Sequence, residues 1–198
     1  MNREPSTMNR KLFAALTASV LCLAPVAAHA QSSDSATVSL SADVEEQCVL
    51  GSPSLTTLSL GDMTGPDGKL TSTMTGASAL VSAQIDNAWC NAPSTLSVNA
   101  EVLSMGTSAP AYATPAGFSR LLTYDAAVSG WPSPVVDSPV NGDTGVSTAA
   151  VGAHAESLLL EISGLDTLNS AGTAVASGMV VEAGTYSGAI VLSLSINP

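Results

Sequence analysis

Few side chains in this sequence suit acid–base or nucleophilic chemistry. His154 is the one histidine outside the N-terminal leader, and it lies just before Glu156 and Ser157. A histidine, an acid and a serine can form a hydrolytic triad, but no serine lies in a Gly-x-Ser-x-Gly turn. Because Glu156 and Ser157 are consecutive, their side chains would face opposite ways on a strand. We therefore interpret His154 as a surface or loop residue and expect no enzymatic activity.

Aspartates in glycine-rich turns are a second group with possible chemistry. Asp62, Asp67 and Asp143 lie in such turns, where carboxylates can gather around calcium. Their spacing does not match an EF-hand loop. Aspartate is also common in turns because its side chain bonds to the backbone two residues on. We expect turn residues here, and no metal or other cofactor.

The cysteines predict a disulfide. Cys22 lies in the apolar N-terminal run and is expected to be removed with it, which leaves Cys48 and Cys90. In an exported chain these two are expected to pair. Closing a loop of about 42 residues would stabilise the fold by ~4 kcal/mol. A metal site would need more ligands than two thiols and His154 supply.

The N-terminus has the pattern of a signal peptide. Arg10 and Lys11 precede an apolar run, and Ala28-His29-Ala30 has the small-x-small form that signal peptidase cleaves. The first 30 residues are thus predicted to be removed, leaving 31–198 as a single exported domain. Because an acidic residue at position 4 is unusual in such a leader, both Met1 and Met8 stay open as the start.

The exported part of the chain is strongly acidic. The whole sequence has a formal net charge of -11, and cleavage after Ala30 would leave Lys69 and Arg120 as the only Lys or Arg residues. Such a surface disfavours nucleic acid and anionic membranes as partners. No second apolar stretch approaches the roughly 18 residues needed to span a bilayer, so we expect no membrane insertion.

Alternating apolar residues predict strands along the exported chain, separated by turns rich in Gly, Pro, Asn and Asp. This pattern predicts an all-β fold, a β-sandwich with an aliphatic core. We expect 129–153 to be a long surface loop with a short strand near Val135-Val136. The alternating sets are Leu96, Val98, Ala100 and Val102; Leu122, Tyr124, Ala126 and Val128; Leu158, Leu160 and Ile162; and Tyr186, Ile190, Leu192, Leu194 and Ile196.

The two tryptophans are predicted to play different roles. Trp89 directly precedes Cys90, and an indole beside a disulfide is typical of core packing. Trp131 lies in a proline-rich turn, and we expect this ring to be exposed. An exposed Trp131 would suit a ligand-contacting loop.

The most regular alternation lies in residues 36–46, just before Cys48. Its apolar positions alternate strictly with polar ones, which indicates a strand with one apolar face. Such a strand can complete its own sheet, or it can leave and complete the sheet of another subunit. The apolar positions are Ala36, Val38, Leu40, Ala42 and Val44.

Three motifs together resemble the spore coat protein U domain family, which is similar to the pilins of the chaperone–usher pathway. They are Ala-Asp-Val-Glu-Glu-Gln-Cys48, Asp-Asn-Ala-Trp-Cys90-Asn-Ala-Pro and the terminal Ala183-Gly-Thr-Tyr through Ile196. The resemblance implies an immunoglobulin-like (pilin-type) sandwich that lacks one strand. A periplasmic chaperone would fill the gap first, and the N-terminal extension of the next subunit would replace it at an outer-membrane usher. Segment 36–46 would be that donor strand.

On this basis we expect a structural subunit of a surface fimbria, pilus or coat, exported through the periplasm of a Gram-negative bacterium. Its partners would be other copies or related subunits, the chaperone and the usher. The alternative is a secreted, adhesin-like binding module whose own N-terminal strand completes the sandwich. Shaft, tip and minor subunits all remain open.

Overall fold

The computed structural model describes residues 36–197. From Asp43 onward the chain forms one compact unit, and residues 36–42 are described by themselves. The predicted signal peptide, with its cleavage residues Ala28 and Ala30, lies outside the described residues.

The described chain is essentially all-β, as predicted. It contains no α-helix within residues 36–197, and its one helical turn is the 3-10 turn η1 (Gly106–Ser108). The strands are β1 (Cys48–Val49), β2 (Val81–Cys90), β3 (Ser94–Ala100), β4 (Leu103–Ser104), β5 (Phe118–Ser119), β6 (Leu121–Ser129), β7 (Val135–Asp137), β8 (Val146–Ser147), β9 (His154–Thr167), β10 (Val180–Val181) and β11 (Ile190–Ile196).

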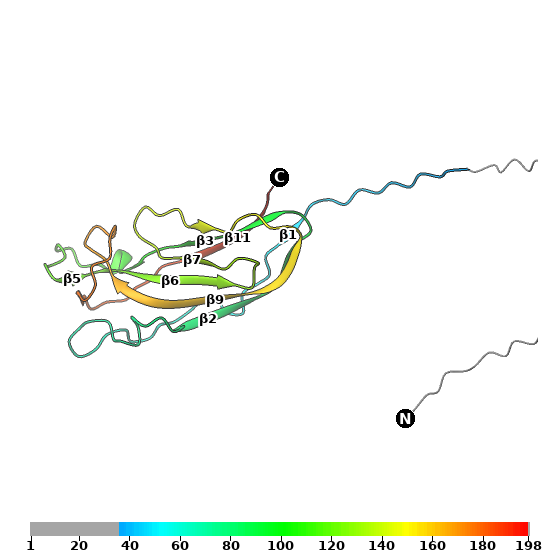
Figure 1. Cartoon of the computed structure of the whole chain (residues 1–198). Coiled ribbons are helices and arrows are strands. Elements are labelled where there is room, and N and C mark those ends of the chain that lie inside the picture. The colour runs from blue at the N-terminus through cyan, green and yellow to red at the C-terminus, as the bar shows by residue number, and fades with distance from the viewer. Residues whose placement is uncertain (1–35, 198) are drawn as a thin grey trace, which may run out of the picture. The chain divides into compact units, whose positions relative to one another are not determined.

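Two sheets carry most of the structure (Figure 1). The larger has the order β1-β2-β9-β6-β4, with β7 also paired to β6, and the smaller has the order β11-β3-β8. β10 and β5 form a separate, parallel pair. The central ladders β2–β9, β9–β6 and β3–β11 are antiparallel. Along each strand, successive side chains point to opposite faces of the sheet.

The hydrophobic core lies between the two sheets. Leu96 and Val98 of β3 are fully buried against the inward faces of β6 and β9, where Val128 and Leu158 are also fully buried. Each such side chain contributes roughly 1.5–3 kcal/mol of burial free energy. The core is mainly aliphatic, as the low aromatic content predicted.

The four alternating segments beyond Cys90 are confirmed as strands β3, β6, β9 and β11, except that Val102 and Tyr186 lie outside them. The short strand predicted near Val135-Val136 is confirmed as β7. The rest of the 129–153 segment is only partly loop, because it also contains β8 and a bridge between Val151 and Ser94.

Strand β2 is ten residues long, and none of the alternating sets described above includes it. A bulge hides its alternation, since the register shifts between Ile85 and Ala88 and Asn87 takes a φ of 62°. Gly51 crosses this bulge so closely that a Cβ would lie 1.6 Å from the carbonyl oxygen of Asp86. A side chain at position 51 would therefore push the two segments apart.

Both tryptophan predictions are wrong. The side chain of Trp131 is only 3% exposed and belongs to the core, because the chain turns inward at Gly130, where a Cβ would lie 2.2 Å from the carbonyl oxygen of Ser157. Trp89 is half-buried and alternates with the buried Ala88, so it faces away from the core.

The prediction that His154 is a surface or loop residue is also wrong. His154 begins β9, pairs with Cys90 across the ladder and has a buried Nε2. Its ring packs edge-on against Trp131, with centroids 4.8 Å apart. The hydroxyl of Ser157, considered above as a partner of His154, donates to the Asp86 carboxylate at 3.1 Å.

Candidate functional site: a groove beside an open strand edge

Strand β11 is an open edge of the smaller sheet. It pairs with β3 from Ile190↔Ala100 to Ile196↔Ser94, and within residues 36–197 no strand pairs with its other side. Alternate backbone N–H and C=O groups of β11 therefore lack a ladder partner. Charged residues and prolines usually protect an edge strand from pairing with another strand, and β11 contains neither. Its backbone is a template for one more strand.

The inward face of β11 is only half-covered. On the neighbouring β3, Leu96 and Val98 are 0% exposed. On β11, by contrast, every inward apolar side chain is partly exposed although the alternation is just as regular. These residues are Ile190, Leu192, Leu194 and Ile196.

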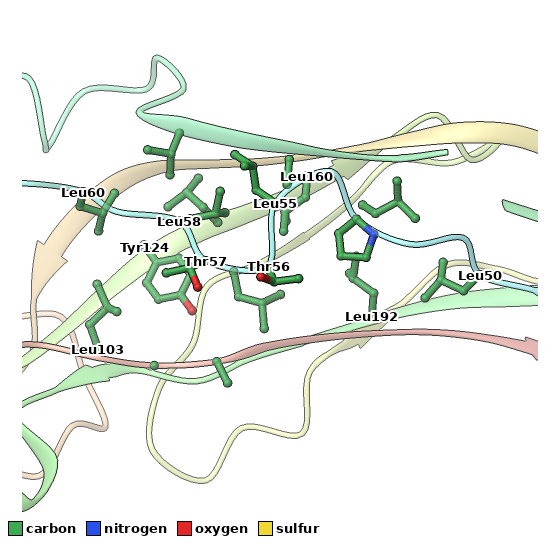
Figure 2. Close-up of a pocket in the computed structure, with 18 of the residues that line it drawn as sticks. Leu50, Leu55, Thr56, Thr57, Leu58, Leu60, Leu103, Tyr124, Leu160 and Leu192 are labelled. Atoms are coloured by element: carbon green, nitrogen blue, oxygen red, sulfur yellow. The ribbon is translucent and has the colours of Figure 1, made fainter. Parts of the chain in front are cut away.

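The uncovered face of β11 borders an apolar groove of about 630 Å³ (Figure 2). The groove lies between β11 on one side and β2 with β9 on the other, and no charged residue lines it. An extended segment with apolar side chains every second residue is the shape and chemistry that such a groove accepts. Its apolar lining includes Val81, Ala83, Ile85, Leu103, Leu160, Ile162, Ile190 and Leu192.

Tyr124 of β6 forms part of the groove lining and presents its ring rather than its hydroxyl. The hydroxyl donates to the carbonyl oxygen of Glu101, at 2.9 Å. Burial, together with the nearby carboxylates of Asp137 and Glu101, raises the pKa of Tyr124 well above its ordinary value of 10.0. The phenol therefore stays neutral, and its hydroxyl already has a hydrogen-bond partner, so an occupant of the groove need not supply one.

Residues 50–60 form a further wall of the groove, and Figure 2 shows Leu58 and Leu60 on this segment. The segment is tied to β2 around Ser54, whose N–H donates to the Gln84 carbonyl at 2.6 Å and whose hydroxyl accepts the Gln84 N–H at 3.0 Å. Residues 55–60 belong to no strand. The groove is therefore bounded by a regular edge, β11, and by a wall without regular pairing.

Residues 36–46, predicted as a strand, form no strand in the single chain. Their larger apolar side chains are exposed to solvent: Val38 is 89% exposed, Leu40 97% and Val44 82%. Ala36 and Ala42 are exposed as well. The role of these five residues as a donor strand stays a prediction. Positions 36–42 carry no charge, so they match the uncharged groove in chemistry.

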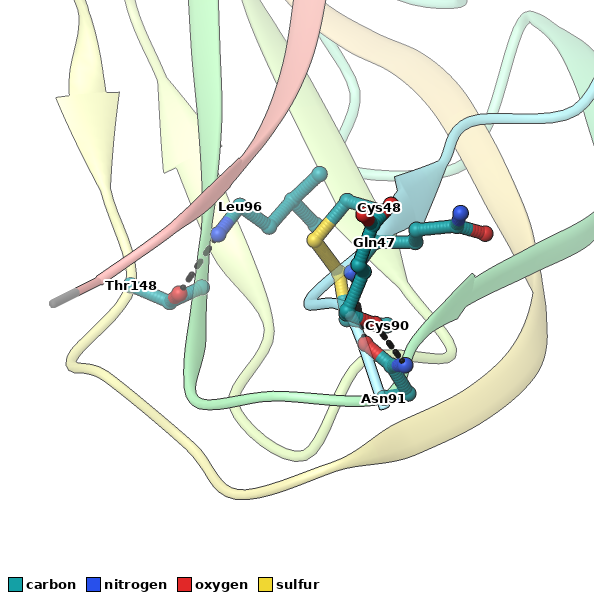
Figure 3. Close-up of a disulfide and its surroundings, with 7 residues drawn as sticks. Gln47, Cys48, Cys90, Asn91, Leu96 and Thr148 are labelled. Atoms are coloured by element: carbon teal, nitrogen blue, oxygen red, sulfur yellow. Dashed lines mark hydrogen bonds between the residues drawn. A yellow bond between two sulfur atoms is a disulfide. The ribbon is translucent and has the colours of Figure 1, made fainter. Parts of the chain in front are cut away.

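The disulfide between Cys48 and Cys90 is confirmed and lies just after this segment (Figure 3). It joins β1 to the end of β2, where the two cysteines are directly opposed in the ladder. The loop that it closes contains the groove wall of residues 50–60. The disulfide thus tethers the end of that wall next to Cys48 to the larger sheet.

A polar cluster outside the groove lining ties the loop before β5 to β10. Arg120 pairs with Glu182, with 2.5 Å between Nε and Oε2, and donates to the carbonyl of Tyr112 at 2.8 Å. The Tyr112 hydroxyl also bonds Glu182. The Arg120 guanidinium, and then the Tyr112 hydroxyl, lower the pKa of Glu182. We interpret this cluster as a structural tie between two loops.

The aspartates considered for calcium are turn residues, as predicted. Asp62, Asp67 and Asp143 each accept a backbone N–H two residues on, at 3.1–3.2 Å. Across residues 36–197 no three His, Cys, Asp or Glu side chains gather as a metal site. The same part of the chain holds no helix with the length and apolarity that crossing a bilayer requires.

What this chain offers for binding is therefore an unpaired strand edge beside an apolar groove, together with an exposed alternating segment. Both features are defined by its own residues. The chain matches no family model, and neither a curated protein nor a solved structure is significantly similar to it.

Proposed function

We propose that this protein is a structural subunit of a surface fibre, a fimbria, pilus or coat, in which each copy donates residues 36–46 to the groove of another copy or of a related subunit. The fold would then be an incomplete immunoglobulin-like sandwich of the pilin type. The observation that carries the proposal is the half-covered inward face of β11 beside an uncharged groove.

The donor and the groove agree in pattern, in length and in charge. β11 has seven residues, and the uncharged part of the extension, residues 36–42, is equally long. With Val38 and Leu40 turned into the groove, Ser39 and Ser41 would face outward. A slip of one residue would reverse this arrangement, so the register is strongly specified.

Both side chains and backbone are needed to hold such a joint. Burying Val38, Leu40 and Val44 contributes roughly 1.5–3 kcal/mol each. Each new ladder hydrogen bond adds about 1 kcal/mol net. Association costs an estimated ~4–15 kcal/mol in lost freedom. A donor segment that loses one large apolar contact is therefore expected to join poorly.

An open, apolar edge needs protection before assembly. A periplasmic chaperone would cover the groove after export across the inner membrane, and an outer-membrane usher would exchange it for the next subunit. This route follows the resemblance to chaperone–usher pilins and gives a cell-surface location.

The alternative of a self-complemented binding module is weakened by the position of Trp131. That module was expected to use an exposed Trp131, whereas the ring is buried in the core. Completion of the groove by the chain's own extension is the remaining form of the alternative, and the following experiment separates the two.

A pair of charge substitutions one residue apart tests the proposal. Leu40→Asp puts a carboxylate into the apolar groove and is expected to abolish assembly, because an unpaired charge is costly to bury. Ser41→Asp adds the same charge to the outward face and should assemble like wild type. Assembly is measured by light scattering and electron microscopy of the exported chain. Equal assembly of wild type and Leu40→Asp, or a stable wild-type monomer that takes up no donor, would overturn the proposal.

A further inference from the structure

Asn91 makes three hydrogen bonds to the base of the N-terminal extension, and Figure 3 shows it beside Gln47 and the disulfide. Its backbone N–H donates to the Gln47 carbonyl at 3.0 Å, and its side-chain oxygen accepts the Gln47 N–H at 2.6 Å. Its side-chain amide donates to the Glu45 carbonyl at 2.8 Å. One side chain thus fixes backbone groups at two positions, directly beside the Cys48–Cys90 disulfide.

These contacts keep residues 45–47 in line with β1. Gln47 and Asn91 are the next opposed pair after Cys48↔Cys90, so the β1–β2 ladder continues one step outward. The hydrogen bond to the Glu45 carbonyl fixes the backbone two residues further toward the N-terminus. Residues 45–47 therefore continue in the direction of β1.

To fill its own groove, the extension would have to reverse direction at the held residues. Residues 50–60 already run along the groove as its wall. A donor strand parallel to that wall would need a connection as long as the strand, about 35 Å at 3.3 Å per residue, and the three residues 47–49 span only about 10 Å. Only an antiparallel hairpin is possible, and its turn would fall on residues 45–47, because Cys48 and Val49 are paired with β2.

We propose that Asn91 is the positioning residue that makes strand donation intermolecular. By bonding residues 45 and 47, its side chain opposes the hairpin that would place the extension in its own groove. The extension then remains free for a second copy of this chain. This inference rests on the proposed function, since it assigns the residue that decides which groove receives the donor.

The test uses four forms of the exported chain: wild type, Asn91→Ala, Leu40→Asp and the double variant Asn91→Ala/Leu40→Asp. The probe is a labelled synthetic peptide of residues 36–46, and its binding to dilute chain is measured by fluorescence anisotropy. Loss of two side-chain hydrogen bonds is expected to weaken peptide binding by Asn91→Ala about tenfold or more, because its own extension now competes. Light scattering should show fewer polymers and more monomer.

The double variant distinguishes positioning from simple structural damage. Leu40→Asp disables the chain's own donor, so the double variant should bind the peptide as tightly as Leu40→Asp alone. Asn91→Asp keeps the acceptor for the Gln47 N–H but loses the donor to Glu45, and should lie between wild type and Asn91→Ala.

Three results would count against the inference. Peptide binding by Asn91→Ala equal to wild type removes any positioning role. Weak binding that Leu40→Asp does not restore makes Asn91 a residue of the fold rather than of donor direction. If Leu40→Asp takes up no peptide at all, the proposed function itself fails, and the inference falls with it.

Discussion

Strands β3 and β11 are neighbours with the same length and the same alternation, and yet they differ in burial. β3 pairs with β11 on one side and with β8 on the other, and its Leu96 and Val98 are fully buried. β11 has β3 on one side only, and its Leu192 and Leu194 remain partly exposed. The burial of an inward side chain in this sandwich therefore depends on whether its strand has two neighbours.

The two strands also differ in how they are tied to the opposite sheet. Asp137 of β7, in the larger sheet, accepts the Ala100 N–H at the end of β3, at 2.7 Å. The inward face of β11 borders the groove instead. One side of the sandwich is thus closed by packing and hydrogen bonding, and the other is left for an additional strand.

The largest effect is expected from truncating matched leucines on the two strands. Leu96→Ala should lower the free energy of unfolding by about 2–5 kcal/mol, because it leaves a cavity in closed packing. Leu192→Ala, on the half-covered face, should cost clearly less in the free chain. Urea denaturation of the monomer measures both.

Adding the peptide of residues 36–46 sharpens the same comparison. The cost of Leu192→Ala should rise once the groove is filled, and the cost of Leu96→Ala should stay the same. Equal costs for the two variants in the free chain would mean that the groove is already closed.

A smaller effect is expected at Asp137, which ties the closed side. Asp137→Ala leaves the buried Ala100 N–H without its acceptor and should cost about 1–3 kcal/mol. Asp137→Asn keeps an acceptor oxygen, so it should cost less than the alanine variant.

The pH dependence of Asp137 has a definite sign. Burial raises the pKa of this carboxyl above its ordinary value of 3.8. Its contribution to stability is therefore fully present below pH 3.8 and decreases as the pH rises through the pKa of the folded state. Asp137→Asn should remove this decrease. The free energy of unfolding of the variant should therefore rise relative to that of wild type from acid to neutral pH. Urea titrations at several pH values measure this difference, and a shift in the opposite direction would contradict the assignment.

Most of the long strands and the disulfide were predictable from the sequence. Period-two alternation identified β3, β6, β9 and β11. The expectation of an exported chain with two cysteines predicted the pairing of Cys48 with Cys90. Both signals depend on residues close in sequence or on a single possible partner. They fix which residues face inward but not whether anything covers them.

The remaining features depend on contacts between distant segments. The bulge at Asn87 broke the alternation of β2, and the inward turn at Gly130 buried Trp131 despite its proline-rich surroundings. The groove wall of residues 50–60 has no regular pairing and gave no strand signal. The sequence showed Asn91 only as part of a motif. Its hydrogen bonds to Glu45 and Gln47 could not be predicted, because these residues are 44–46 positions away in the sequence.

Hydrogen exchange along β11 tests the central claim most directly. In the monomeric Leu40→Asp chain, alternate amides of β11 should exchange rapidly while those of β3 are protected. Addition of the 36–46 peptide should then protect β11 to the level of β3. Amides of β11 that are already as protected as those of β3 in the free monomer, or that do not respond to the peptide, would contradict an open edge that waits for a strand from another copy.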